Sequence, residues 1–138
     1  MLSSDIARRL AEERATAALA LVEVGSFSSA YYLAGYAVEL GLKAIIAKQF
    51  VADVIPDKQF VLSIYSHKLA DLLKLAGLQT ALTQAANEKP TLQENWLTAS
   101  QWSESSRYAI SDEVVAREFV AAVTDPAEGV LQWLKSHC

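Results

Sequence analysis

The sequence predicts an all-α fold for residues 1–138, organised as a single domain, and three observations support this. Alanine and leucine are abundant, whereas only 5 glycines and 3 prolines are present to interrupt helices. Apolar residues recur at intervals of three and four over long segments. No segment of alternating apolar and polar residues is longer than a few positions, so the pattern gives no indication of β-strands.

The first predicted helix spans about residues 4–24. Ser3 or Ser4, followed by Asp5, makes a good helix start. The apolar residues that follow at helical spacing are Ile6, Leu10, Ala17 and Leu21. Gly25 then ends the pattern. A second helix is predicted to begin at a cap on Ser26 or Ser28 and to run to about residue 49, and because it is apolar on nearly all sides we expect it in the centre of the fold.

Residues 50–66 form a connection in which Pro56 interrupts the chain, with one or two helical turns possible over residues 57–62. Ser66 is then predicted to cap a short helix that ends at Gly77, a natural C-terminal stop. The apolar face of this helix consists of Leu69, Leu72, Leu73 and Ala76.

The remaining helices are predicted from weaker signals. Residues 78–87 continue as a helix until the Lys89-Pro90 break, and a further turn or two is expected over residues 92–99. After a polar link, the last helix is predicted to start at Ser111 and to run to about residue 136, bent or broken at residues 124–126 because Pro126 removes a backbone donor. Asp112 and Glu113 in its first turn suit the positive end of the helix dipole.

Composition and charge exclude several classes of protein. The formal net charge of −4 argues against a general phosphate-binding surface, although a local basic pocket remains possible. The single cysteine, Cys138, permits no internal disulfide, which suits a reducing compartment. The N-terminus lacks the apolar core of a signal peptide, and no run is long enough to span a membrane. We therefore expect a soluble, cytoplasmic protein.

A narrow polar stripe lies on the predicted central helix. On a helical wheel Tyr32, Tyr36, Glu39 and Lys43 fall within about 60° of one another, among apolar neighbours. Glu39 and Lys43 have the i, i+4 spacing that lets the two side chains meet. Two interpretations are open: the stripe is the only side of the helix that faces solvent, or it borders a cleft or interface in which the ion pair is partly desolvated.

Two further positions are candidates for function. His67 is expected in the first turn of the helix after Ser66, where the simpler interpretation is a neutral ring hydrogen-bonded to a loop carbonyl. Arg107 and Tyr108 lie in the polar link before the last helix. The arginine is either solvated, in a surface ion pair, or directed into a cleft between helices. No metal-ligand cluster, phosphate-binding loop or catalytic triad is present, so we expect no metal and no cofactor.

Three phrases occur together in order: SAYYLAGYAVELGLKA, SHKLADLLKLAGL, and an Arg-Tyr pair before a last helix that ends in VLQWL. In this combination, from about residue 30 to 134, the sequence resembles the HEPN family, the higher eukaryotes and prokaryotes nucleotide-binding domains. The resemblance implies an antiparallel bundle of four to five helices, here with a short extra helix or loop between the second and third helices. It also implies a homodimer, often paired with a small nucleotidyltransferase in toxin–antitoxin-like systems.

Many members of that family are ribonucleases with an Arg, four to six residues, then His motif near the last helix. After Arg107 the corresponding positions hold Asp112, Glu113 and Val114, so the ribonuclease motif is absent here. The resemblance implies a cleft that gathers the candidate ligand-binding residues, with a phosphate contact at two of them, Lys43 and Arg107. These candidates are Tyr36, Glu39, Lys43, His67, Arg107 and Tyr108.

Three functions remain open at this level. The leading hypothesis is a non-catalytic, dimeric HEPN binding module that works with a nucleotidyltransferase or binds nucleotide or RNA phosphate. The second is a ribonuclease toxin with an atypical site around Arg107. The third is a purely structural interaction domain.

Overall fold

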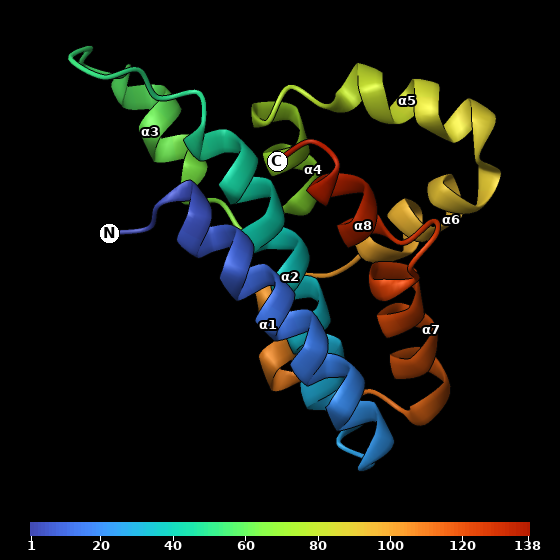
Figure 1. Cartoon of the computed structure of the whole chain (residues 1–138). Coiled ribbons are helices and arrows are strands. Elements are labelled where there is room, and N and C mark those ends of the chain that lie inside the picture. Colours follow the sequence, from blue (N-terminus) through green and yellow to red (C-terminus); the bar gives the residue numbers. More distant parts are fainter.

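The structure, a computed structural model, describes residues 1–138 and contains only helices, which confirms the predicted all-α class. Eight α-helices and one 3₁₀ turn, η1, make up the chain (Figure 1). None of the helices combines the length and hydropathy that crossing a membrane requires. The elements are α1 (Ser4–Glu23), α2 (Phe27–Ala47), α3 (Lys58–Ile64), α4 (Leu69–Leu75), α5 (Gln79–Glu88), α6 (Pro90–Ala99), η1 (Glu104–Tyr108), α7 (Glu113–Thr124) and α8 (Val130–Lys135).

Helices α1 and α2 form an antiparallel hairpin. The turn between them is made at Gly25, whose φ of +83° is in the left-handed region that favours glycine. At the other end the Ser4 hydroxyl donates to the Ala44 carbonyl at 2.7 Å. The buried face of α1 consists of small side chains: Ala7, Ala11, Ala15, Ala18 and Val22. Ile6, which helped to indicate the helix by its spacing, is 45 % exposed, because the line of alanines lets α2 approach closely and leaves this larger residue outside.

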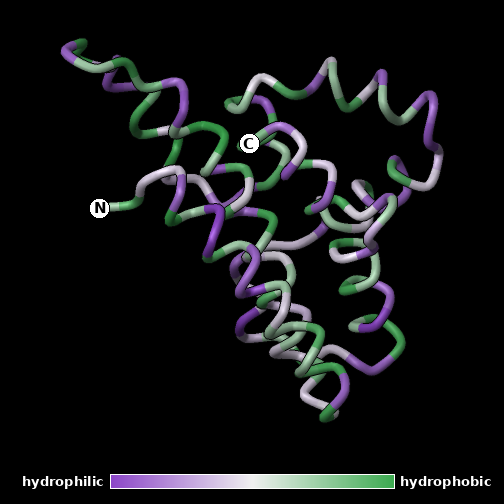
Figure 2. The backbone as a smooth tube through the Cα atoms, in the orientation of Figure 1, coloured by the Kyte–Doolittle hydropathy of each residue, from purple (hydrophilic) through white to green (hydrophobic).

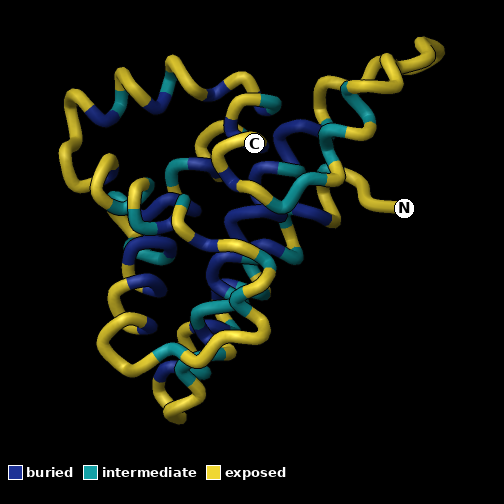
Figure 3. Tube along the Cα trace, turned by 180° about the vertical axis from the view of Figure 1, so that it is seen from behind, coloured by how far each residue is buried: buried dark blue, intermediate teal, exposed yellow.

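Helix α2 is the centre of the molecule, as predicted. It packs against α1, α4, α7, α8 and η1, and most of its residues are buried (Figure 3). Two of these neighbours, α7 and α8, lie along one side of the hairpin in Figure 1. Helix α2 and its neighbours enclose a single hydrophobic core, which includes residues of α1, α2 and α7.

The connection from α2 to α4 contains the expected short helix, α3, which Asp57 caps by accepting from the Phe60 N–H at 3.0 Å. Helix α3 has no buried residue and projects from the bundle (Figure 1). The predicted cap at Ser66 is wrong. Lys68 occupies the N-cap position of α4, and the Ser66 hydroxyl instead accepts from the Lys68 N–H in the preceding turn. His67 therefore lies in a link before the helix and not in its first turn.

The second half of the chain follows the predicted order with shifted boundaries. Pro90 occupies the first turn of α6, where its missing N–H leaves no hydrogen bond unmade. Helix α5, in which hydrophobic and hydrophilic residues alternate (Figure 2), stands at the edge of the molecule. Asp112, and not Ser111, caps α7. The predicted last helix is broken into α7 and α8, because the Asp125 carboxylate accepts from the Ala127 and Glu128 N–H groups and turns the chain.

Candidate functional site

Glu39 is the only charged residue among the buried ones, with 1 % of its surface exposed. Helix geometry brings Lys43 alongside it one turn later, and the Lys43 Nζ donates to Glu39 Oε2 at 3.3 Å. The other carboxylate oxygen, Oε1, lies 2.8 Å from His67 Nδ1. Each oxygen thus has its own cationic or hydrogen-bonding partner, which is the condition for keeping a carboxylate out of water. The stripe on α2 is therefore not a solvent-facing side of the helix at this position.

His67 connects three separate segments of the chain. Its Nδ1 faces Glu39 on α2, and its Nε2 lies 3.2 Å from Glu104 Oε2 at the start of η1. The His67 side chain is 41 % exposed and that of Glu104 is 45 % exposed, so this end of the cluster reaches solvent. The simpler prediction for His67, a bond to a loop carbonyl, is wrong: both ring nitrogens face carboxylates.

We call Glu39 and its neighbours Lys43, His67 and Glu104 the Glu39 cluster. A row of aromatic side chains lies beside it. The ring centroid of Tyr32 is 6.1 Å from that of Tyr36 and 6.0 Å from that of Trp102, which is buried. The Trp102 ring packs directly on Gly35, where no Cβ stands in the way. Burial raises the pKa of Tyr36, and the nearby Glu39 charge raises it further. Tyr36 is therefore a neutral hydroxyl at physiological pH.

Arg107 and Tyr108 lie apart from that cluster, at the end of η1. Both are exposed, Tyr108 by 80 %, and the Arg107 Cζ stands 4.9 Å from the centroid of the Tyr108 ring. Arg107 takes part in none of the ion pairs of the structure, which are those of Arg8, Arg9, Arg14, Lys43, His67, Arg117 and Lys135. Its guanidinium keeps its full capacity to bind an anion.

Arg107 lines a groove of about 260 Å³ between η1 and the first turns of α2. We call it the Arg107 groove; its lining residues are Ser28, Ser29, Tyr32, Leu33, Ser106, Arg107 and Ala109. The groove contains hydroxyl groups and one cation but no carboxylate. Its opposite edge is fixed by the Ser111 N–H, which donates to Ser28 Oγ at 2.8 Å. The Ser106 hydroxyl is buried and has no hydrogen-bond partner in the protein.

The six candidate residues thus divide between two neighbouring places. Glu39, Lys43 and His67 share one cluster beside Tyr36, whereas Arg107 and Tyr108 belong to the groove and to the surface next to it. Tyr32 and η1 connect the two places.

Sequence reasoning missed two kinds of residue at these places. Glu104 gives no signal beyond its place three residues before Arg107 in a polar link. Ser28 was considered only as a helix cap, and Ser29 was not singled out. The contact of Trp102 with Gly35 joins residues far apart in the chain, so only a pairing of an aromatic with a helical glycine could have indicated it.

Other parts of the surface offer less chemistry. A larger hollow of about 810 Å³ lies between α5 and α6, and none of its lining residues is charged. No group of three or more metal-ligating side chains is present anywhere in the chain. Comparison of the chain with family sequence profiles, with curated proteins and with solved structures finds no match. The function is therefore inferred from the residues around Glu39 and from the Arg107 groove.

Proposed function

We propose that the chain is a HEPN-like binding module that holds a phosphate-bearing ligand, a nucleotide or a stretch of RNA, in the Arg107 groove without cleaving it. One observation carries this proposal: an exposed guanidinium without an acidic partner lines a groove whose other polar groups are hydroxyls. A guanidinium binds phosphate oxygens through paired N–H groups, and such charge-assisted bonds are stronger than neutral ones.

The surroundings of Arg107 suit the rest of such a ligand. Tyr108 next to it is exposed, and aromatic rings of this kind stack on nucleobases without sequence preference. Ser28 and Ser29 belong to the first turn of α2, a long helix whose N-terminus carries positive partial charge and no acidic residue. Lys43 is left out of the proposed phosphate contact, because its side chain is only 13 % exposed and its ammonium is already bound to Glu39.

Absence of cleavage is part of the proposal, and the positions of the two histidines support it. In the ribonucleases of the HEPN family an arginine acts together with a histidine. Neither histidine of this chain lines the Arg107 groove: His67 faces two carboxylates, and the His137 ring packs on Trp133 with centroids 4.6 Å apart. No observation favours the alternative of a ribonuclease toxin.

The module acts as a homodimer with a nucleotidyltransferase-type partner, as the resemblance implies. The apolar side chains next to the Arg107 groove suit a second copy of the chain. They lie at the end of η1, on the segment that follows it and on the first turn of α7, with exposed fractions of 80, 96, 65 and 46 % for Tyr108, Ile110, Val114 and Val115. Burying such a patch is favourable, because each apolar side chain removed from water contributes to association.

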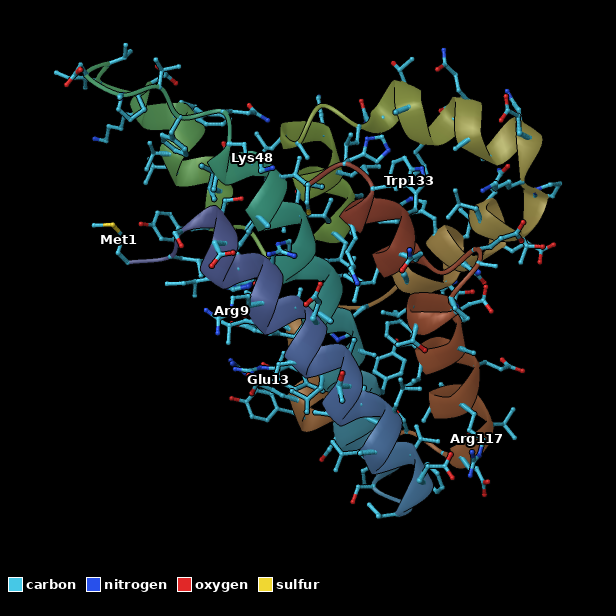
Figure 4. The ribbon with its side chains drawn as sticks, viewed as in Figure 1. Met1, Arg9, Glu13, Lys48, Arg117 and Trp133 are labelled. Carbon is cyan, nitrogen blue, oxygen red and sulfur yellow. The ribbon has the colours of Figure 1, made fainter.

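Binding of ATP and of a short, fluorescently labelled single-stranded RNA tests the proposal. Arg107→Gln should weaken binding of the ligand that is held by about ten- to a hundredfold, the effect of losing a charge-assisted hydrogen bond. Arg9→Gln is the matched control, because Arg9 is 73 % exposed on the outer face of α1 (Figure 4) and should leave affinity unchanged. The RNA should stay intact during the assay. Equal loss in both variants, or no binding of either probe by the wild-type protein, would overturn the proposal.

A further inference from the structure

His67 lies between two carboxylates, those of Glu39 and Glu104. The inference drawn from this position rests on the proposed function and extends it. We propose that His67, as an imidazolium held by Glu39 and Glu104, clamps the start of η1 to α2 and so positions the Arg107 groove, which makes ligand binding there depend on a proton. The distances are 2.8 Å from Nδ1 to Glu39 and 3.2 Å from Nε2 to Glu104. His67 is a positioning residue and does not line the groove.

The hydrogen-bond inventory of the ring explains why a proton matters. A neutral imidazole donates through one nitrogen only, so one of the two carboxylates would face a lone pair. The imidazolium donates through both nitrogens and satisfies both carboxylates at once.

The charges around the ring point the same way. Glu39 and Glu104 bring two negative charges, from α2 and η1, and Lys43 brings one positive charge from α2. In its own link the ring is followed by Lys68, whose side chain is exposed, and Tyr36 on α2 is neutral. Arg14 of α1 also brings positive charge to the Tyr36 side of these groups, and the imidazolium adds a positive charge directly between the two carboxylates.

The clamp acts on the wall of the Arg107 groove. Glu104 is the first residue of η1, and Ser106 and Arg107, which line the groove, follow within the same turn. Beyond η1 the chain is tied to α2 by the bond from the Ser111 N–H to Ser28. His67 is thus the side-chain tie at the start of η1, and the Ser28 bond is the tie after its end. Loss of the first tie leaves the packing of Trp102 on Gly35 to hold the chain at the start of η1.

Hydrogen–deuterium exchange of the ligand-free protein tests the clamp without any ligand. Three amides in and after η1 report on the clamp. The Ser106 and Ala109 N–H groups donate to the Ser103 and Ser106 carbonyls, and the Ser111 N–H donates to Ser28 Oγ. We expect their protection, corrected for the intrinsic effect of pH, to be about three- to tenfold lower at a pH where nitrogen NMR shows the His67 ring neutral than at a pH where it shows both ring nitrogens protonated. Glu104→Gln should show the lower protection already at low pH.

Matched variants keep the test specific. Glu88→Gln removes an exposed carboxylate that forms no ion pair, and His137→Gln removes the other histidine; both should leave the exchange of the link unchanged. Nitrogen NMR of the ring gives a second measurement, in which both His67 nitrogens should carry protons at low pH. Protection of the link that is independent of pH and of Glu104 would overturn the clamp.

Measuring ligand affinity at different pH values separates the role of His67 from the proposed function. If ATP or the labelled RNA binds, its affinity should fall about three- to tenfold between the same two pH values in the wild-type protein and be equally weak at both in Glu104→Gln. A bound ligand whose affinity ignores both changes would overturn the positioning role. If neither probe binds, the proposed function fails, while the exchange and NMR measurements still decide whether the clamp exists.

Discussion

Glu39 shows how one buried charge can hold distant segments together. Its carboxylate is satisfied from its own helix by Lys43 and from a link 28 residues away by His67. Because each partner also reaches toward solvent, the cluster avoids the full cost of burying an isolated ion pair. The stripe on α2 therefore stabilises the packing of the bundle in addition to any role next to a binding site.

Glu39→Gln should lower the free energy of unfolding by about 2 kcal/mol, because the charged carboxylate that pairs with both Lys43 and His67 is lost. Denaturant unfolding measures this. Glu113→Gln is the matched control: Glu113 pairs with Arg117 at the same i, i+4 spacing but is 57 % exposed, so its loss should cost no more than about 0.5 kcal/mol. Equal effects of the two substitutions would show that burial of Glu39 contributes nothing.

The raised pKa of Tyr36 predicts how the stability of the protein changes at alkaline pH. Burial and the charge of Glu39 raise its pKa above the ordinary value of 10.0, so the unfolded chain loses the phenolic proton before the folded chain does. The free energy of unfolding should therefore decrease as pH rises above about 10, and Tyr36→Phe should reduce this decrease. Unfolding curves at several alkaline pH values give the comparison. Tyr65→Phe, at a residue 73 % exposed, should leave the alkaline slope as it is, and a flatter slope in this control would contradict the assignment.

At the scale of elements, boundaries were predicted to within a few residues wherever a local signal exists. Gly25, Gly77 and Pro90 mark ends and starts of helices as expected, because their backbone preferences act without help from the rest of the fold. Ser66 was misjudged, since a serine hydroxyl can accept from a turn N–H as well as from a helix N–H. No buried face of α1 was predicted from the sequence, because the alanines that form this face differ little in hydrophobicity from its other positions.

The contact between α2 and Trp102 predicts that alanine substitutions at two glycines of α2 will change stability differently. Gly35→Ala should destabilise the protein by about 1 to 3 kcal/mol, because the new Cβ would overlap the Trp102 ring. Gly41→Ala is the control: its Cβ would meet the Leu131 Cδ1 at 3.2 Å, a side-chain end that can shift, and the helix gains up to about 1 kcal/mol from alanine. Thermal unfolding should separate the two variants. A Gly35→Ala protein as stable as the wild type would mean that Trp102 moves freely.

At the scale of the whole molecule, apolar side chains are exposed at both ends. One group lies next to the Arg107 groove and includes Ile110, and the other lies around the connection between α2 and α3 and includes Ile55, with exposed fractions of 96 and 94 %. The groove, the unpaired arginine and the first group lie together. If the chain forms the homodimer of the proposed function, we expect the second copy to pack on the group that includes Ile110.

The mass in solution tests that assignment. Analytical ultracentrifugation at micromolar concentration should give nearly twice the 15.0 kDa of one chain. Ile110→Asp should shift the mass toward that of one chain, because a charge would have to be buried in the interface. Ile55→Asp matches it in residue type and exposure and should keep the dimer. A wild-type protein with the mass of one chain would refute the dimer, and dissociation by the Ile55 variant alone would place it at the other end.

The sequence by itself determined the helical class, the order of the helices and the central place of α2, because periodicity, caps and breakers act over a few residues. It also marked Glu39, Lys43, His67 and Arg107 as unusual polar positions. Only the tertiary structure decided that Glu39 is buried, that His67 is held between it and Glu104, and that Arg107 lines a separate groove. These arrangements depend on contacts across many residues of the chain, and such contacts follow from packing, which no local pattern records.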